Sequence, residues 1–421
     1  MNNEKNRLIP DLRFPEFANA EEWSIKDFGE LIKLLADFTA NGSFASLKEN
    51  ITYFSTEEYA VLVRTTDLDK KIFIPARFTD KRGYDFLSKT SLFGNEIVMA
   101  NVGSIGKVFR VPYFKKPMTL APNTYVLKFN DFVDEDFIYQ LMLRSVFEQK
   151  LLSMVGSSTL MAINKSNLRS IKVEIPTLVE QQKIASCLSS LDELITAQKE
   201  KLELLKNHKK GLMQNLFPQE GETVPKFRFP EFENNGDWEE KILNEVADYE
   251  NGKAHEQGIV EEGKFIVVNS KFISTEGGKS KQTNLANCPA KQGDVLMVLS
   301  DLPNGKALGK CFYITTDDKY TVNQRICKIT SFDCDSKLLF YIMNRNAYFL
   351  YFDDGVKQTN LKNEDVQTFP FLLPKNKIEQ EKIASCLSSL DHLISSQTEK
   401  IEKLQLHKKG LMQGLFPKMI D

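Results

Sequence analysis

The sequence predicts an α+β protein: two mixed α/β domains separated by two long helices that form an antiparallel coiled coil, in a circular arrangement with pseudo-twofold symmetry. Three observations predict this fold. Residues 180–218 return at 379–417 with 29 of 39 positions identical. The motif Arg-Phe-Pro-Glu-Phe occurs at both 13–17 and 228–232. Finally, aliphatic residues recur along both long copies at alternating spacings of three and four, which is typical of a heptad repeat.

The repeats divide the 421-residue chain into four segments. We expect a first domain over 1–176, a first helix over 177–218, a second domain over 219–376 and a second helix over 377–421. Because the motif recurs after 215 residues and the long repeat after 199, the first domain is longer by about 16 residues.

The two domains differ in sequence but share a faint pattern. Segment 96–99 (Glu-Ile-Val-Met) resembles 294–297 (Asp-Val-Leu-Met), and the Gly-Lys step at 106–107 resembles the one at 309–310. We also match Asn123 and Lys128 with Asn323 and Lys328. The pattern predicts that both domains have the same fold.

Each long repeat is expected to form one helix with a narrow apolar seam, ended by Pro218 or Pro417. Since both seams have the same pattern, the simplest partner for each is the other; the alternative is that each helix packs only on its own domain. An antiparallel pair needs no long crossing linker. The predicted seam residues are Ile184, Leu188, Leu191, Ile195, Leu202, Leu205, Ile383, Leu387, Leu390, Ile394, Ile401 and Leu404.

The order of the motifs indicates a circular arrangement. The segment containing Arg-Phe-Pro-Glu-Phe follows Pro218, and by repetition it would follow Pro417. It is found at the N-terminus instead, so the sequence reads as a ring opened near residue 421.

Composition excludes several classes of protein. The net charge is −2, no apolar run approaches the length of about 18 residues that spans a bilayer, and the N-terminus lacks the apolar core of a signal peptide. We therefore expect a cytoplasmic protein. The six cysteines form no CxxC pair, which favours reduced thiols over disulfides or zinc, and we expect no metal and no cofactor.

No set of residues predicts catalysis. The two Gly-Lys segments lack the glycine spacing and the Ser/Thr of a phosphate-binding loop, and no Pro-Pro dipeptide is present to form the Asn/Asp-Pro-Pro-aromatic loop of an amino-methyltransferase. We read the Gly-Lys segments as turns between strands that expose a lysine.

Local charge indicates a nucleic-acid partner. Five Lys or Arg and no acid lie between residues 97 and 130, and five Lys and one Glu lie between 263 and 293. Tyr, Phe, Asn and Gln are interleaved with them, and these side-chain types bind phosphates and base edges. The candidate DNA-binding residues are Lys107, Arg110, Asn123, Lys306, Lys310, Gln324 and Arg325.

These features together resemble the specificity (S) subunit of type I restriction-modification systems. The resemblance covers the whole chain and is most specific where Pro176 and Glu180-Gln181 lead into Ile184-Ala185 and Leu191-Asp192. The first domain departs from it at Asn95-Glu96, where the family often has Gly-Asp.

The resemblance implies two target-recognition domains that each read one half of an asymmetric double-stranded DNA site. It also implies paired helices that space the halves and dock two modification (methyltransferase) subunits, with motor-nuclease restriction subunits joining the complex. The chain itself would be non-catalytic. Two alternatives stay open: a coiled-coil scaffold for protein partners that binds no DNA, and the recognition subunit of a combined methylase-nuclease.

Overall fold

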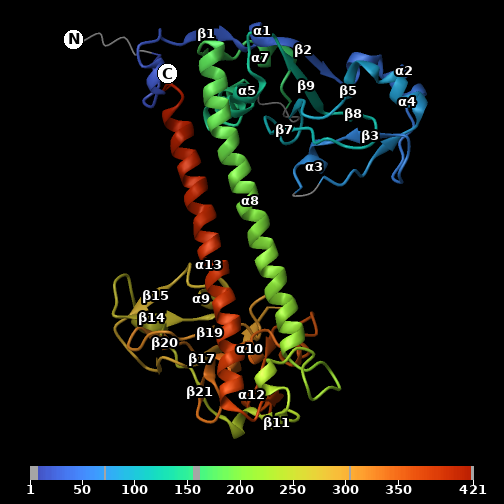
Figure 1. The fold of residues 1–421 in the computed structure, drawn as a ribbon. Coiled ribbons are helices and arrows are strands. Elements are labelled where there is room, and N and C mark those ends of the chain that lie inside the picture. The colour runs from blue at the N-terminus through green and yellow to red at the C-terminus, as the bar shows by residue number, and fades with distance from the viewer. Residues whose placement is uncertain (1–7, 71–72, 155–161, 303–304, 419–421) are drawn as a thin grey trace, which may run out of the picture. The chain divides into compact units, whose positions relative to one another are not determined.

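A computed structural model describes residues 8–70, 73–154, 162–302 and 305–418 (Figure 1). The chain forms two compact units, Met1–Lys199 with Lys400–Asp421, and Glu200–Glu399. Each unit contains one mixed α/β domain together with part of each long helix.

The first domain is built on two four-stranded sheets. Their strand orders are β2-β9-β6-β7 and β4-β3-β8-β5, and β3 runs parallel to β8 with Val63 opposite Leu120. The strands are β2 Ile32–Asp37, β3 Ala60–Val63, β4 Phe78–Thr79, β5 Ser91–Leu92, β6 Ile97–Ala100, β7 Val108–Arg110, β8 Met118–Leu120 and β9 Thr124–Phe129.

The second domain repeats this topology. A four-stranded sheet has the order β12-β21-β17-β19, and a five-stranded sheet has the order β13-β15-β14-β20-β16, in which β14 runs parallel to β20. The strands are β12 Ala247–Asn251, β13 Ile259–Val260, β14 Phe265–Val268, β15 Lys281–Thr283, β16 Pro289–Ala290, β17 Val295–Val298, β19 Cys311–Tyr313, β20 Tyr320–Val322 and β21 Ile326–Ser331. The shared strand order confirms that the two domains have one fold.

Three short strand pairs complete the domains. β1 (Ser24–Asp27) pairs with β10 (Lys172–Ile175), β11 (Glu239–Ile242) with β23 (Pro370–Leu373), and β18 (Ser300–Asp301) with β22 (Thr359–Asn360). The first two pairs join the beginning of each domain to its end, directly before the long helix.

Short helices cover the sheets. Equivalent aspartates begin two of them: the side chains of Asp134 and Asp335 accept hydrogen bonds from the N–H groups of Phe137 and Leu338. The helices are α1 Phe28–Leu31, α2 Phe44–Asn50, α3 Thr65–Leu68, α4 Lys81–Phe86, α5 Glu135–Met142, α6 Ser145–Ser153, α7 Lys165–Arg169, α9 Ser270–Ser274, α10 Ser336–Met343, α11 Ala347–Leu350 and α12 Asn363–Gln367.

The two long repeats are single helices, α8 (Leu178–Leu216) and α13 (Lys377–Gly414). In the first unit Asp192 of α8 pairs with Lys408 of α13 at 2.6 Å, and in the second unit Lys209 of α8 pairs with Asp391 of α13 at 2.5 Å. The beginning of each helix therefore lies beside the end of the other, which confirms the antiparallel pair.

The predicted seam positions are covered to different degrees. Ile184 and Leu188 belong to the core of the first domain, and Ile383 and Leu387 to that of the second. The first turns of each helix thus pack on their own domain, but α8 and α13 also contact one another, so the alternative that each helix packs only on its own domain is wrong. Among the other seam positions, Ile195, Leu390 and Ile401 are buried and Leu191, Leu202, Leu205, Ile394 and Leu404 are half-buried.

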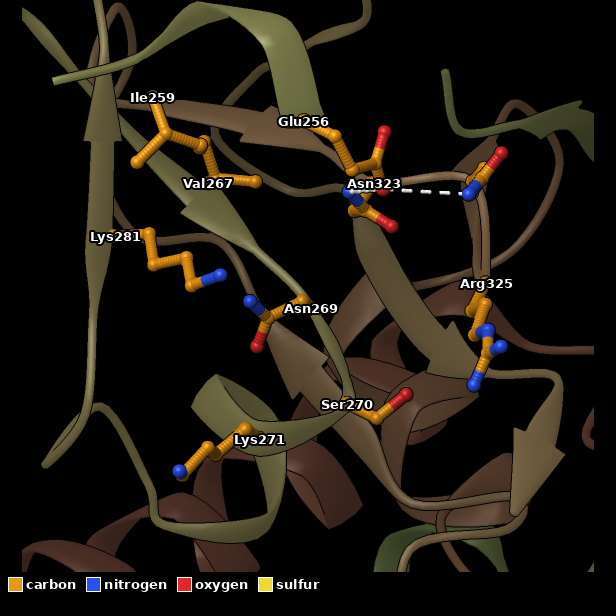
Figure 2. Close-up of a pocket in the computed structure, with 10 residues that line it drawn as sticks. Glu256, Ile259, Val267, Asn269, Ser270, Lys271, Lys281, Asn323 and Arg325 are labelled. Atoms are coloured by element: carbon orange, nitrogen blue, oxygen red, sulfur yellow. Dashed lines mark hydrogen bonds between the residues drawn. The ribbon is translucent and has the colours of Figure 1, made fainter. Parts of the chain in front are cut away.

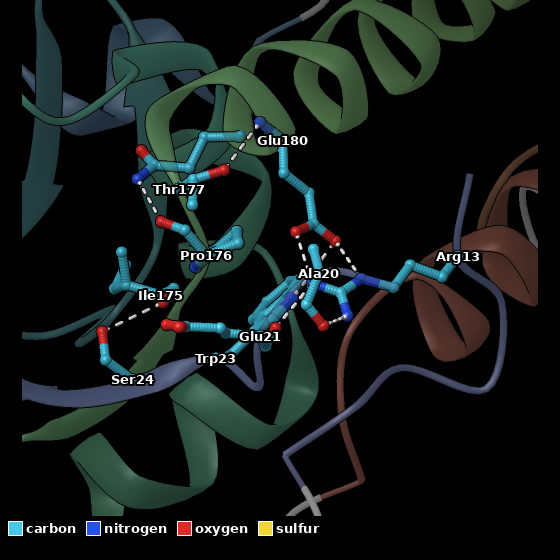
Figure 3. A network of polar contacts seen from close by, with 10 residues as sticks. Arg13, Ala20, Glu21, Trp23, Ser24, Ile175, Pro176, Thr177 and Glu180 are labelled. Carbon is cyan, nitrogen blue, oxygen red and sulfur yellow. Dashed lines mark hydrogen bonds and ion pairs between the residues drawn. The ribbon is translucent and has the colours of Figure 1, made fainter. Parts of the chain in front are cut away.

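An equivalent Arg–Glu pair joins each domain to its long helix. Arg13 donates from Nε and Nη2 to the two carboxylate oxygens of Glu180, both at 2.8 Å (Figure 3). Arg228 and Glu379 repeat this pairing at 2.7 and 2.9 Å. All four side chains are nearly fully buried, and the hydrogen bonds to Glu180 raise the pKa of Arg13. The Arg-Phe-Pro-Glu-Phe motif therefore fixes each domain to its long helix, and we call each of these two Arg–Glu pairs a joint.

None of the six cysteines, all of which lie within the described residues, is in a disulfide bond. Among the described residues, no helix has the length and apolar composition needed to cross a membrane.

Candidate nucleic-acid interface

The two Gly-Lys segments form equivalent turns. The N–H of Gly106 donates to the carbonyl oxygen of Ala100 at 3.1 Å, and that of Gly309 donates to Val298 at 3.0 Å. Both glycines have a positive φ, 80° and 65°, a region that a residue without Cβ adopts at little cost. The sequence match and the interpretation as turns between strands are both confirmed.

The lysines of these turns are ion-paired. Lys107 Nζ lies 2.9 Å from Asp69, and Lys310 Nζ lies 3.2 Å from Glu276. In both domains the acid follows a short helix, α3 or α9. Each lysine would have to exchange its carboxylate for a phosphate in order to bind DNA.

Arg110 is held inside the first domain. Its guanidinium donates to the Asn95 carbonyl oxygen at 2.8 Å, contacts the Asp136 carboxylate, and lies 5.1 Å from the centre of the Tyr139 ring. Only 17% of its side chain is exposed. The guanidinium of Arg110 would have to leave these contacts within the domain in order to bind DNA.

The strand register corrects one sequence match. Thr124 pairs with Ala100, and Ile326 pairs with Val298, so Thr124 and Ile326 are equivalent. Asn123 is therefore the counterpart of Arg325. The match of Asn123 with Asn323 was wrong by two residues, because it assumed an offset of 200 residues, whereas the strand pairing gives an offset of 202. The match of Lys128 with Lys328 fails for the same reason.

A polar hollow of about 430 Å³ lies on the second domain (Figure 2). It is bounded by the carboxyl ends of β14 and β20, the start of α9, and strands β13 and β15. We call it the amide hollow. It is lined by Glu256, Ile259, Val267, Asn269, Ser270, Lys271, Lys281, Asn323, Gln324 and Arg325.

The charge of the amide hollow is mainly positive. Lys271, Lys281 and Arg325 are exposed there, against the one carboxylate of Glu256. Glu256 Oε1 accepts hydrogen bonds from Asn323 Nδ2 at 3.4 Å and Gln324 Nε2 at 3.3 Å. Bonds from its own backbone N–H and from Asn323 lower the pKa of Glu256, so this side chain is ionised at neutral pH.

The predicted DNA-binding residues are thus only partly brought together. Gln324 and Arg325 line the amide hollow, Lys306 is exposed elsewhere on the second domain, and Asn123 is exposed on a turn of the first. The sequence analysis did not select Asn269, Lys271 or Lys281. One signal was present: the runs of aromatic and β-branched residues at 265–268 and 320–322 are each followed by Asn, although only the structure shows that these strands are parallel neighbours.

Among the residues that the structure describes, no cluster of three or more His, Cys, Asp or Glu could hold a metal ion.

Comparison with known proteins supports the expected family. The family model for the type I restriction modification DNA specificity domain matches residues 20–207 and 235–406, most of the chain. The chain therefore belongs to this family, that of type I specificity subunits, and carries two recognition domains.

Two curated relatives from Methanocaldococcus jannaschii illustrate the similarity. The type I restriction enzyme MjaVIII specificity subunit is 26% identical over 309 residues, covering 68% of this chain and 70% of the relative. The putative MjaX specificity subunit is 23% identical over 424 residues, covering 94% and 93%. The crystal structure of a type I S subunit from M. genitalium has the same fold, with a TM-score of 0.62, 17% identity, and coverage of 98% of this chain and all of that one.

Proposed function

We propose that this chain is the non-catalytic DNA-recognition subunit of a type I restriction-modification complex, in which each domain reads one half of an asymmetric double-stranded site. One observation carries the proposal. The two domains share their strand order, yet the side chains on equivalent strand ends differ. A shared scaffold with different exposed side chains is suited to reading two different half-sites.

We further propose that the near-identical parts of the chain dock two copies of one modification subunit, through which motor-nuclease restriction subunits join the complex. The duplicated joints support this, because Arg13–Glu180 and Arg228–Glu379 present the same geometry twice. The complex would act in the cytoplasm, where its DNA substrate lies.

Exchange of one domain tests the proposal. Residues 239–374 are replaced by the corresponding segment of another specificity subunit, and the chimera is expressed with the modification subunit in a host that lacks other methylases. Methylation sequencing should show one half-site changed and the other retained. A change in both halves, or in neither, contradicts modular reading.

The length of the helix pair is proposed to set the gap between the half-sites. Inserting seven residues in α8 after Leu202, with seven at the facing position of α13 after Gln397, preserves the seam because the heptad is complete. The added length of about 10 Å should lengthen the spacer by about three base pairs. An unchanged spacer in a folded variant contradicts this role.

The scaffold alternative is tested by DNA binding. A gel shift with the chain and its modification subunit, measured across salt concentrations, should show affinity falling steeply with salt because phosphate contacts release counterions. Absence of binding at low salt would favour a protein scaffold. The third alternative, a combined methylase-nuclease partner, is distinguished by whether the co-purifying modification subunit also cleaves DNA.

A further inference from the structure

The amide hollow lies where two parallel strands of the second domain end. β14 and β20 are neighbours, with Val268 opposite Val322. The next residue of each strand is an asparagine, Asn269 or Asn323, so both leave the sheet at the same edge. Polar side chains that follow the carboxyl ends of parallel strands converge, and this is where open sheets commonly bind ligands.

Local hydrogen bonds orient the amides at this edge. Asn269 Oδ1 accepts from the N–H of Phe272 at 2.9 Å, which fixes the side chain at the start of α9. Asn323 and Gln324 both donate to Glu256. Figure 2 shows Asn269 and Lys281 extending towards one another across the hollow. Three amides are therefore held beside three cations on one accessible surface.

This combination fits duplex DNA. Side-chain amides can both donate to and accept from a base edge, and the pattern they match best is that of adenine in the major groove. Lys and Arg at the margin of such a surface suit the flanking phosphates, which fix the register of a protein on DNA.

We propose that the amide hollow is where the second domain reads its half-site: Asn269, Asn323 and Gln324 contact base edges, and Lys271, Lys281 and Arg325 contact phosphates. The proposal rests on the proposed function and adds which surface of the second domain contacts the DNA. It predicts an A·T pair among the base pairs that this half-site specifies.

The first domain supports this assignment by contrast. At the equivalent edge, β3 and β8 end at Val63 and Leu120, and they are followed by Arg64 and Ala121. An arginine replaces the first asparagine, and a residue without a polar side chain replaces the second. Equivalent positions thus carry different chemistry, as two unlike half-sites require.

The experiment compares methylation by the full chain, expressed with its modification subunit, between wild type and Asn323→Ala/Gln324→Ala. Methylation sequencing should show the first half-site unchanged and the second degenerate at one or two positions, where discrimination falls about ten- to hundred-fold. Lys271→Ala and Lys281→Ala should leave the motif unchanged and each lower the slope of log affinity against log salt by about one.

Controls separate failure of this proposal from failure of the proposed function. Gln292→Ala removes an exposed amide that precedes β17 and is not part of the lining of the amide hollow, so it should leave the motif unchanged. Gln324→Met at an exposed position repeats the test without threatening the fold. An unchanged second half-site in these hollow variants, or degeneracy in the first, overturns the assignment. If deleting the whole chain leaves the methylation pattern unaltered, the proposed function itself is wrong.

Discussion

The backbone N–H of Leu12 donates a 2.8 Å hydrogen bond to the carbonyl oxygen of Gly414. Its counterpart in the second unit is the 2.9 Å hydrogen bond from the N–H of Phe227 to the carbonyl oxygen of Asn215. Phe227 is equivalent to Leu12 through the motif repeat, and Asn215 is equivalent to Gly414 through the long repeat. The second contact joins residues close in sequence, whereas the first joins the two ends of the chain. The circular arrangement expected from the motif order is therefore built from specific backbone contacts in the first unit.

The C-terminal aromatic residue should be essential to the first domain. Phe416 is fully buried, with ring centres 5.8 Å from Trp23 and 5.3 Å from Phe137. Phe416→Ala should lower the free energy of unfolding of this domain by about 3–5 kcal/mol, because it leaves a large cavity. Hydrogen exchange during denaturant titration measures each domain separately.

The repeat supplies a matched control. Phe217 is equivalent in sequence but only half-buried, with its ring centre 6.1 Å from Trp238. Phe217→Ala should cost less and act on the second domain. Equal losses in both domains from Phe416→Ala would show that the ring does not belong specifically to the first core.

The ion pair between Asp192 and Lys408 should help to hold the register of the helix pair. Asp192 also accepts a hydrogen bond from Gln140 at 2.9 Å, which ties the pair to the first domain. Because 41% of the aspartate side chain is exposed, water screens the attraction, and we expect a coupling energy of only about 1 kcal/mol.

A double-mutant cycle of Asp192→Ala and Lys408→Ala measures this coupling, and the same cycle on Asp391 and Lys209 is the internal comparison. Exchanging the charges, Asp192→Lys with Lys408→Asp, should recover part of the loss. Additive single effects would mean that the pair contributes nothing to register.

Arg64 should determine bases of the first half-site only. Its Nε and Nη2 donate to the two carboxylate oxygens of Asp67 at 2.9 and 2.6 Å, which holds the guanidinium in one orientation. A guanidinium fixed in this way suits guanine, which accepts two parallel hydrogen bonds. Arg64→Lys keeps the charge opposite buried Asp67 but loses the fork, so it should relax a G·C position about tenfold or more.

Methylation sequencing of the Arg64→Lys complex provides the measurement. Arg77→Lys, at an exposed position of the same domain, is the control for loss of a guanidinium as such. A first half-site that keeps full discrimination in Arg64→Lys would show that Arg64 supplies charge alone.

Thiol labelling should distinguish two classes of cysteine. Burial raises the pKa of Cys327 to about 12 and that of Cys334 to about 11, and it also raises the pKa values of Cys288 and Cys311. Since the thiolate is the reactive form, these four remain protonated and slow at pH 8.

Cys187 and Cys386, which are half-buried on the long helices, should therefore react first in the native protein. Mass spectrometry after a short exposure to iodoacetamide identifies the labelled residues, and denaturation should expose all six. Rapid native labelling of Cys327 would contradict the described packing of the second domain.

The repeats made the architecture predictable from sequence alone. The 39-residue copies define helices that the structure bounds at Leu178–Leu216 and Lys377–Gly414, and the antiparallel direction followed from connectivity. The Gly-Lys turns were also recognisable, because a turn that needs a positive φ retains its glycine when the strands around it diverge.

The candidate site was harder to predict because it depends on partners distant in sequence. Nothing local to Arg110 indicates that Asp136 and Tyr139 hold its guanidinium, and nothing near Lys107 indicates its pairing with Asp69. Asn269 and Asn323 are brought to one edge only by the parallel pairing of β14 and β20. Basic composition identified the domains that carry exposed charge, but not which cations remain accessible.

The identical joints have a genetic consequence. Arg13 with Glu180, and Arg228 with Glu379, are the same contacts made by repeated sequence. Recombination between the DNA segments that encode the two long repeats would place a new domain on an existing helix without disturbing a joint. A population could in this way acquire chains with a new domain while the contact between domain and long helix stays the same.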